Sequence, residues 1–280
     1  MRIANLGGRL AVVTDGRAID VHTASDALFP PDPQAVYSRW AEFRAWAGTA
    51  DLTGGKPFDA ADLGAPAPAP RQLFAIGLNY REHVAEAGFT TPHGMPPVFT
   101  KFVTALTGPV TEVTLPPGGH TDWEVELVVV LGKEARDVAE SDAWSHVAGL
   151  TVGQDISERV LQMDGPAPQF SLGKSYPGFA PTGPWLVTPD EFDDPDDLEL
   201  TCAVNGEEVQ RGRSGQLIFS VPALIAKLSG VLPLFPGDLI FTGTPAGVGL
   251  GRTPQRWLAP GDELVSSIEG IGELRQRFVG

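Results

Sequence analysis

One segment, residues 122–131, limits the fold more than any other because it joins a strand pattern to acidic side chains. It reads Asp-Trp-Glu-Val-Glu-Leu-Val-Val-Val-Leu and has no Gly or Pro before Gly132, which predicts a β-strand. Side chains two positions apart share one face of a strand, so Glu124 and Glu126 lie about 7 Å apart along it. If protein covers that end of the strand, two uncompensated charges are costly, and a bound divalent cation removes the cost. Two solvated surface glutamates are the alternative interpretation.

A second predicted strand, residues 150–157, offers a third carboxylate. It contains Asp155 and leads directly into residues 158–162. Three carboxylates without a nearby Cys or His form an all-oxygen ligand set, which suits Mg²⁺, Mn²⁺ or Ca²⁺ better than Zn²⁺. Three protein ligands also leave coordination positions open for substrate and water. The two strands together predict a divalent-cation site made of Glu124, Glu126 and Asp155.

Composition narrows the class of protein. The chain of 280 residues has 33 Gly and 26 Pro, which indicates many turns and short strands. Its formal net charge of −15 argues against a nucleic-acid partner. The single cysteine, Cys202, excludes an intramolecular disulfide and fits a reducing compartment; its strand-like surroundings place it in the core. Neither a signal-type run at the N-terminus nor a membrane-length apolar stretch is present, so we expect a cytoplasmic protein without membrane contact.

The N-terminal quarter has a pattern of its own. Residues 1–63 predict a small unit of strands and a helix, with a hairpin at Asp15-Gly16. The helix should begin at Pro33, with Asp32 as its cap, and end near Gly48; its aromatic residues at every third position predict a core-facing stripe. Residues 64–70, Gly-Ala-Pro-Ala-Pro-Ala-Pro, predict an extended linker, which leaves residues 71–280 as a second, larger domain.

A histidine–glutamate pair follows the first predicted strand of that domain. Asn79 is the predicted cap of a short helix, residues 80–87, which Gly88 would end. His83 and Glu86 stand three positions apart, so their side chains are neighbours on the helix. A carboxylate beside an imidazole orients it and raises its basicity, as a general base acting on water requires; a surface pair of little consequence is the alternative. The Gly- and Pro-rich residues 88–98 predict a mobile loop that can act as a lid.

Two lysines and a glycine-rich loop complete the candidates. Lys101 lies in a predicted strand, where a solvated side chain is the simplest interpretation. Lys174 follows Gly173 at the predicted edge of a strand and is either a ligand for an anion or a surface lysine. Residues 242–249 form a Gly-rich loop whose backbone N–H groups can hold a carboxylate, although the loop lacks the spacing and the lysine of a phosphate-binding loop.

Over residues 70–280 these features together resemble the fumarylacetoacetate hydrolase family. The resemblance rests on an ordered set of short motifs: Gly77-Leu78-Asn79-Tyr80 with His83 and Glu86; Phe99 with Lys101; Gly108-Pro109; Asp122, Glu124 and Glu126-Leu127; Gln154-Asp155-Ile156-Ser157 with Arg159 and Gln162; Gly173-Lys174-Ser175; Pro181 with Gly183-Pro184-Trp185; Asn205-Gly206; Pro236-Gly237-Asp238; and Thr242-Gly243-Thr244-Pro245. It implies an α+β, mostly β fold, in which a mixed β-roll or sandwich forms the catalytic domain beside a small N-terminal α/β unit. It also implies a homodimer.

The resemblance assigns roles to individual residues. It implies metal ligands at Glu124, Glu126 and Asp155, catalytic groups at His83, Glu86 and Lys174, and substrate or oxyanion contacts at Tyr80, Lys101, Arg159, Gln162 and Thr244. Two positions depart from the family pattern: Pro177 stands where many members have Asp, and Glu158 replaces a small residue. The run around Glu158 resembles a branch that acts on sugar-derived 2,4-diketo-3-deoxy acids.

The implied activity is hydrolysis of a carbon–carbon bond. A 2,4-diketo acid, either an acylpyruvate or a sugar-derived acid, would give pyruvate and a carboxylic acid, with Mg²⁺ or Mn²⁺ as cofactor and Ca²⁺ as a further option. His83, oriented by Glu86, would activate the water. Oxaloacetate decarboxylation and keto–enol isomerisation stay open, since both would use the same metal site. A non-enzymatic Ca²⁺-binding protein is the third alternative.

Overall fold

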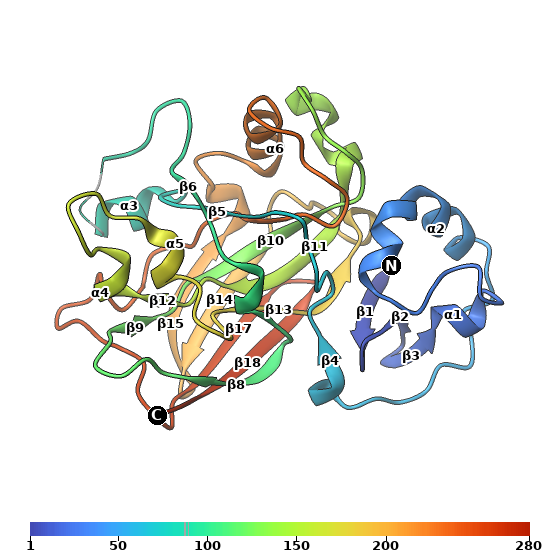
Figure 1. Ribbon diagram of the computed structural model, residues 1–280, viewed down its shortest axis with the longest axis horizontal. Helices are drawn as coiled ribbons and strands as arrows, with labels where there is room; N and C mark the ends of the chain where they lie inside the picture. Colours follow the sequence, from blue (N-terminus) through green and yellow to red (C-terminus); the bar gives the residue numbers. More distant parts are fainter. Residues whose placement is uncertain (87, 89) are drawn as a thin grey trace.

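Two β-sheets packed face to face make up most of the computed structural model, which describes residues 1–86, 88 and 90–280 (Figure 1). The larger sheet has eleven strands. Along its main path they run in the order β3 (Arg17–Asp20), β2 (Arg9–Thr14), β1 (Arg2–Leu6), β13 (Ala180–Val187), β11 (Val147–Gln154), β10 (Val125–Leu131), β16 (Leu239–Phe241), β5 (Leu73–Ile76) and β6 (Val98–Thr100), with β4 (Leu63–Gly64) beside β1 and β7 (Leu106–Thr107) beside β13.

The second sheet has five strands and closes one face of the first. Its order is β15 (Glu207–Arg213), β14 (Glu199–Val204), β17 (Glu263–Ile268), β18 (Gly272–Val279) and β8 (Val110–Thr114). A pair of short strands, β9 (Thr121–Asp122) and β12 (Ser157–Glu158), stands apart from both sheets. The main hydrophobic core lies between the sheets and includes Cys202, whose burial raises its pKa to about 12. The predicted mostly-β fold and the core position of the cysteine are confirmed.

The helices of the described residues are short. They are α1 (Val21–Ala24), α2 (Trp40–Ala47), α3 (Arg81–Glu86), α4 (Arg159–Gln162), α5 (Phe170–Gly173) and α6 (Val221–Ser229), with 3-10 turns at Gln34–Arg39, Ala60–Asp62, Val103–Ala105, Glu140–His146, Pro189–Glu191 and Ser214–Gln216. None of these helices has the length and apolar character needed to cross a membrane.

The N-terminal unit forms as predicted but continues the large sheet. The hairpin at Asp15-Gly16 is confirmed, and both residues have positive φ (51° and 69°), as its tight turn requires. The predicted helix is a 3-10 turn followed by α2, and Phe43 in its aromatic stripe is fully buried. β1 pairs antiparallel with β13, so the sheet runs from this unit into the rest of the molecule. The domain boundary at residues 63–71 stays a prediction; within the predicted linker, Pro66 accepts a hydrogen bond from Tyr37 Oη.

Several predicted elements differ from the structure, and the differences shape the site. The predicted strand 122–131 is broken: β9 ends at Asp122 and β10 begins at Val125. The predicted strand 150–157 breaks in the same way between β11 and β12. The two breaks face each other, because Asp155 N donates to Glu124 O at 2.9 Å. Glu124 and Asp155 therefore both lie where the regular ladder stops and the backbone can turn side chains inward.

Two further predictions are wrong. Lys174 follows helix α5 and not a strand. Asn79 does not serve as the cap of α3, since its side chain joins Phe219 and the carbonyl of Thr242. α3 is confirmed over residues 81–86; Ala87, its predicted last residue, and Phe89 in the predicted lid lie outside the described residues.

Candidate metal centre and active site

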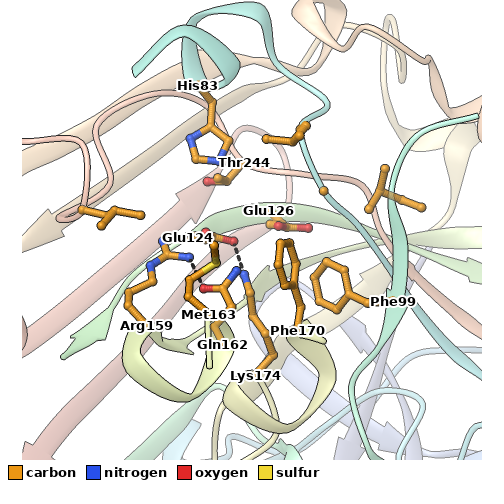
Figure 2. A pocket seen from close by; sticks show the side chains of 14 residues that line it. His83, Phe99, Glu124, Glu126, Arg159, Gln162, Met163, Phe170, Lys174 and Thr244 are labelled. Atoms are coloured by element: carbon orange, nitrogen blue, oxygen red, sulfur yellow. Dashed lines mark hydrogen bonds and ion pairs between the residues drawn. The ribbon is translucent and has the colours of Figure 1, made fainter. Parts of the chain in front are cut away.

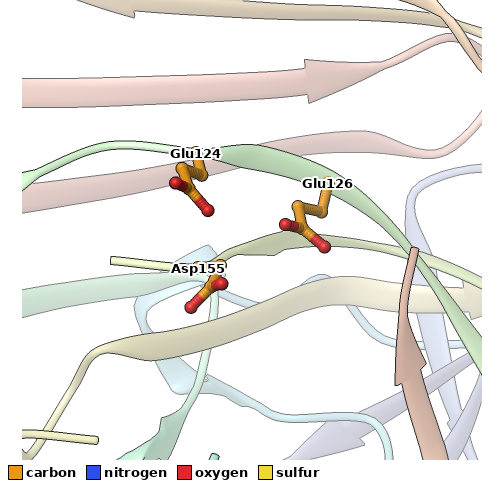
Figure 3. Close-up of side chains that lie close together, drawn as sticks. All are labelled: Glu124, Glu126 and Asp155. Carbon is orange, nitrogen blue, oxygen red and sulfur yellow. The ribbon is translucent and has the colours of Figure 1, made fainter. Parts of the chain in front are cut away.

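Three carboxylates converge at the paired strand breaks (Figure 3). Glu124 precedes β10, Glu126 lies within it, and Asp155 follows β11. One oxygen from each lies within 4.8 Å of the others, and all three side chains are buried. The convergence that the spacing predicts is therefore confirmed, and the solvated-surface alternative is wrong.

The described cationic side chains around this cluster pair with Glu124 but not with Glu126, so a metal cation can still bind there. Glu124 accepts hydrogen bonds from Arg159 and Lys174, each at 2.7 Å. Glu126 forms no ion pair with any described residue, and its Oε2 accepts from Gly243 N at 2.8 Å. Burial, together with the charges of Asp155 and Glu124, raises the pKa of Glu126 well above its usual value. A divalent cation among the three oxygens would remove this penalty, and an all-carboxylate set suits a hard cation such as Mg²⁺ or Mn²⁺.

Two buried lysines hold two of the three carboxylates in place. Lys174 Nζ donates to Glu124 and to Asp155, both at 2.7 Å. Lys101 Nζ donates to the other oxygen of Asp155 at 2.5 Å and to the carbonyl of Lys174. Both lysines are at most 2% exposed, so the solvated interpretation of each is wrong. Burial lowers the pKa of Lys101, whereas at Lys174 burial is outweighed by Asp155 and Glu124, and its pKa is raised.

Helix α4 delivers Arg159 and Gln162 to the cavity because Glu158 caps it. The Glu158 carboxylate accepts from Val160 N at 3.1 Å and from Leu161 N at 2.6 Å. It also accepts from His120 N at 2.9 Å. Glu158 is not among the cavity-lining residues, so its departure from the family pattern builds the helix end instead of the cavity wall.

Asp122 is an organising residue that belongs to one of the sequence motifs but received no role from them. Its Oδ2 accepts from Arg159 Nε at 2.9 Å and Nη2 at 2.7 Å, while its Oδ1 accepts from Gly249 N at 2.6 Å. Arg159 Nη1 in turn donates to Gln162 Oε1 at 2.9 Å. Asp122 thus holds Arg159 in position and connects the Gly-rich loop, residues 242–249, to the segment that carries Glu124 and Glu126. Its place two positions before Glu124 was the available signal.

Replacing Asp122 by Asn should lower stability strongly. Because the Asp122–Arg159 pair is buried, removing the Asp122 charge leaves Arg159 with only its ion pair to Glu124, and breaking a buried pair typically costs about 3–5 kcal/mol. Urea unfolding measures the loss. Asp20→Asn is the control, since the Arg9–Asp20 pair is largely exposed and should contribute below about 1 kcal/mol. Equal unfolding midpoints for the two variants would contradict the role given to Asp122.

His83 lies across the cavity from Glu124 and Glu126 (Figure 2). His83 Nδ1 lies 2.9 Å from Glu86 Oε1, so the predicted contact is confirmed. Glu86 is itself held by Gly247 N, at 3.1 and 2.9 Å. Gly247 has φ +109°, a conformation that a side chain would strain. With Nδ1–H donated to a carboxylate, Nε2 keeps its lone pair for accepting a proton.

Two predicted substrate contacts have other partners or none. The Thr244 hydroxyl donates to Val125 O and accepts from Gln210 Nε2, both at 2.8 Å. Gln210 Oε1 also accepts from Val125 N at 3.0 Å, so this buried glutamine joins the Gly-rich loop to the backbone between two metal ligands. Tyr80 Oη is buried without a hydrogen-bond partner among the described residues. The substrate roles of Tyr80, Lys101 and Thr244 stay predictions.

The cavity between the dyad and the carboxylates has a volume of about 230 Å³. This is below the roughly 300–1,000 Å³ of pockets for drug-sized ligands, so it suits a small acid. Its lining residues are Ile76, Gly77, Leu78, His83, Phe99, Glu124, Glu126, Arg159, Gln162, Met163, Phe170, Lys174, Thr244 and Leu250.

Comparison with known proteins identifies the family. Residues 72–279 match the profile of the fumarylacetoacetate (FAA) hydrolase C-terminal domain. The chain belongs to the fumarylacetoacetate hydrolase family. The match covers the five-stranded sheet and the large sheet from β5 onward, without β1 to β4, and it confirms the resemblance seen in the sequence motifs. Family membership also sets aside the non-enzymatic Ca²⁺-binding alternative, since the named relatives are hydrolases, tautomerases and isomerases.

Relatives in this family carry different reactions. Human mitochondrial oxaloacetate tautomerase FAHD2A is 43% identical over 216 residues, which are 77% of this chain and 68% of the relative. The 2,4-didehydro-3-deoxy-L-rhamnonate hydrolase of Sphingomonas sp. (strain SKA58) is 45% identical over 216 residues, or 76% and 75% of the two chains. Family membership therefore fixes the type of metal-dependent enzyme without fixing the reaction.

Solved structures agree with the fold. The crystal structure of a protein assigned as HpcE from Mycobacterium smegmatis is 56% identical, has a TM-score of 0.96, and covers 100% of this chain and 99% of that one. The maleylpyruvate hydrolase of Sphingobium sp. SYK-6, 29% identical with a TM-score of 0.79 and similar coverage (100% and 99%), was crystallised with manganese(II) and pyruvate.

Proposed function

We propose that this enzyme hydrolyses the C3–C4 bond of a 2,4-diketo acid to give pyruvate and a carboxylic acid. The observation that supports this most is that His83, which contacts Glu86, lines the same small cavity as Glu124 and Glu126, two of the three clustered carboxylates. Proton abstraction from water needs a base within hydrogen-bond reach of that water. A dyad anchored through Gly247 meets this need.

The chain's own residues support each step. His83 Nε2 takes a proton from water, and the hydroxide attacks the C4 carbonyl carbon. The uncommitted N–H groups of Gln162 and Arg159 donate to the resulting oxyanion; one such donor typically contributes on the order of a hundredfold or more in rate. The C3–C4 bond then breaks, its electron pair passes to the enolate of pyruvate, and the proton held by His83 is available to C3. Lys174 keeps Glu124 and Asp155 in place throughout.

The cofactor we propose is Mg²⁺ or Mn²⁺, held by Glu124, Glu126 and Asp155. When bound, it supplies Lewis-acid stabilisation of negative charge on the substrate oxygens. Manganese in a 29% identical hydrolase and the oxygen-only ligand set support this choice; Ca²⁺ has the same ligand preference and is the weaker catalyst to test beside them.

Keto–enol tautomerisation of oxaloacetate is the second candidate, because a 43% identical relative carries that name. In that reaction His83 would move a proton between C3 and an oxygen of the substrate, and no water would attack. Decarboxylation of oxaloacetate would need neither water attack nor the dyad, and would release CO₂.

Oxygen labelling separates these reactions. We expect an acylpyruvate to be hydrolysed in ¹⁸O-labelled water with one label in the released carboxylic acid, and faster than oxaloacetate is decarboxylated or tautomerised. The label is measured by mass spectrometry, and the oxaloacetate reactions by CO₂ release and enol absorbance. Tautomerisation of oxaloacetate without cleavage of any diketo acid would favour the second candidate.

The remaining assignments are also proposals. We propose a small-molecule diketo acid as the only partner besides a second copy of the chain, and a cytoplasmic location. Light scattering at several protein concentrations tests the homodimer.

A further inference from the structure

We infer that the acyl group of the substrate is apolar, so that this enzyme selects alkyl or aryl acylpyruvates over sugar-derived diketo acids that carry hydroxyl groups. The inference rests on the proposed hydrolase function and concerns the same cavity. It differs from the branch suggested by the sequence around Glu158, because that residue caps α4 and lines no part of the cavity.

One wall of the cavity is apolar. Phe99 and Phe170 meet edge to face, with ring centroids 5.6 Å apart, and Figure 2 shows both rings on the opposite side of the carboxylates from Arg159. Ile76, Leu78 and Leu250 add aliphatic surface. Leu78 has φ +56°, an unusual conformation for a residue other than glycine, at the turn that leads from β5 toward α3.

Most polar side chains that line the cavity already form hydrogen bonds with other groups of the protein. Arg159 donates to Asp122, Glu124 and Gln162. Lys174 donates to two carboxylates, and its Nζ lies 5.2 Å from the centroid of Phe99. The Thr244 hydroxyl hydrogen is donated to Val125 O.

The uncommitted polar groups are few and lie at the reacting end. Among the described residues, the uncommitted side-chain groups of the cavity lining are the N–H₂ of Gln162, His83 Nε2, Glu126 Oε1 and single remaining hydrogens on Arg159 and Lys174. These groups can form hydrogen bonds with the carboxylate and the keto oxygens of the substrate and with the attacking water. A hydroxyl on the acyl group would face the apolar wall, and a buried hydroxyl without a partner is costly.

A matched pair of substrates tests the inference. 2,4-Dioxohexanoate and its 5-hydroxy derivative differ by one hydroxyl. With Mn²⁺ present, we expect kcat/KM to be roughly 10- to 100-fold higher for the first, since apolar pockets discriminate against one added hydroxyl by up to about a hundredfold. Equal or reversed values would overturn the apolar assignment while leaving the hydrolase proposal intact, and failure to cleave either acid would overturn both.

Substitutions at Phe170 test whether the aromatic wall causes the selectivity between the two acids. Phe170→Ser should lower the ratio of the two kcat/KM values at least fivefold, whereas Phe170→Leu, which keeps an apolar surface, should preserve it. An unchanged ratio in a folded Phe170→Ser variant would overturn the role of the aromatic wall. If thermal unfolding shows that the serine variant does not fold, the wild-type ratio still decides the inference.

Discussion

Glu126→Gln is expected to lower turnover by roughly a thousandfold or more while leaving the fold intact. A metal ion at such a site contributes several kcal/mol of transition-state stabilisation, and about 4 kcal/mol corresponds to a thousandfold. Glutamine has nearly the same shape, and its side-chain oxygen can still accept from Gly243 N, as Glu126 does. Isothermal titration with Mn²⁺ should show weakened binding. Glu112→Gln, on an exposed side chain, is the control and should behave as wild type.

The same variant makes a prediction about pH. In the metal-free protein the pKa of Glu126 is raised by burial and by Asp155 and Glu124, so the folded state holds its proton more tightly than the unfolded state does. Stability must then fall as pH rises above the unfolded pKa of about 4.5. We expect metal-free wild type to lose stability relative to Glu126→Gln as pH rises above about 4.5, and Mn²⁺ to reverse the difference, because wild type binds the ion more tightly than the variant and gains more stability from it. Parallel pH–stability curves would contradict the buried charge at Glu126.

His83→Ala is expected to lower kcat for diketo-acid hydrolysis by roughly a hundredfold to ten-thousandfold, the usual contribution of a general base. Glu86→Gln should cost less, because Glu86 orients the imidazole and does not itself transfer the proton. Metal-dependent decarboxylation of oxaloacetate should change little, since it needs no base to activate water. Steady-state kinetics on both substrates measure this contrast.

The control for the base is His93→Ala, because His93 is exposed and does not line the cavity. Added imidazole should restore part of the activity of His83→Ala, since a free imidazole can fill the space left by the ring. Hydrolysis at the wild-type rate in His83→Ala would remove the dyad from the proposed mechanism.

Local sequence spacing predicted the parts of the site that depend on one element. Glu124 and Glu126 stand two positions apart, and their carboxylates converge as that spacing predicts, although β10 begins only at Val125. His83 meets Glu86 because a helix brings together side chains three apart. The ordered motifs predicted the family, and with it the mostly-β fold. These predictions hold because each depends on geometry within a few residues of chain.

Only the tertiary structure decided how the charges are balanced. In the sequence, Lys101 looks like a solvated lysine and Lys174 like either a surface lysine or a ligand for an anion. Both are buried against Asp155, which lies 54 residues from Lys101. No local pattern encodes such a contact. Asp122 likewise becomes a hub only when Arg159 and the Gly-rich loop reach it.

The strand breaks also depend on contacts that no local sequence pattern encodes. The Val- and Leu-rich pattern favours an unbroken strand, but buried glutamines replace the ladder at the turn: Gln154 Oε1 accepts from Glu124 N at 2.8 Å, and Gln210 Oε1 accepts from Val125 N at 3.0 Å. Because these partners come from distant strands, the sequence determined which residues form the site, and long-range packing determined how they are held.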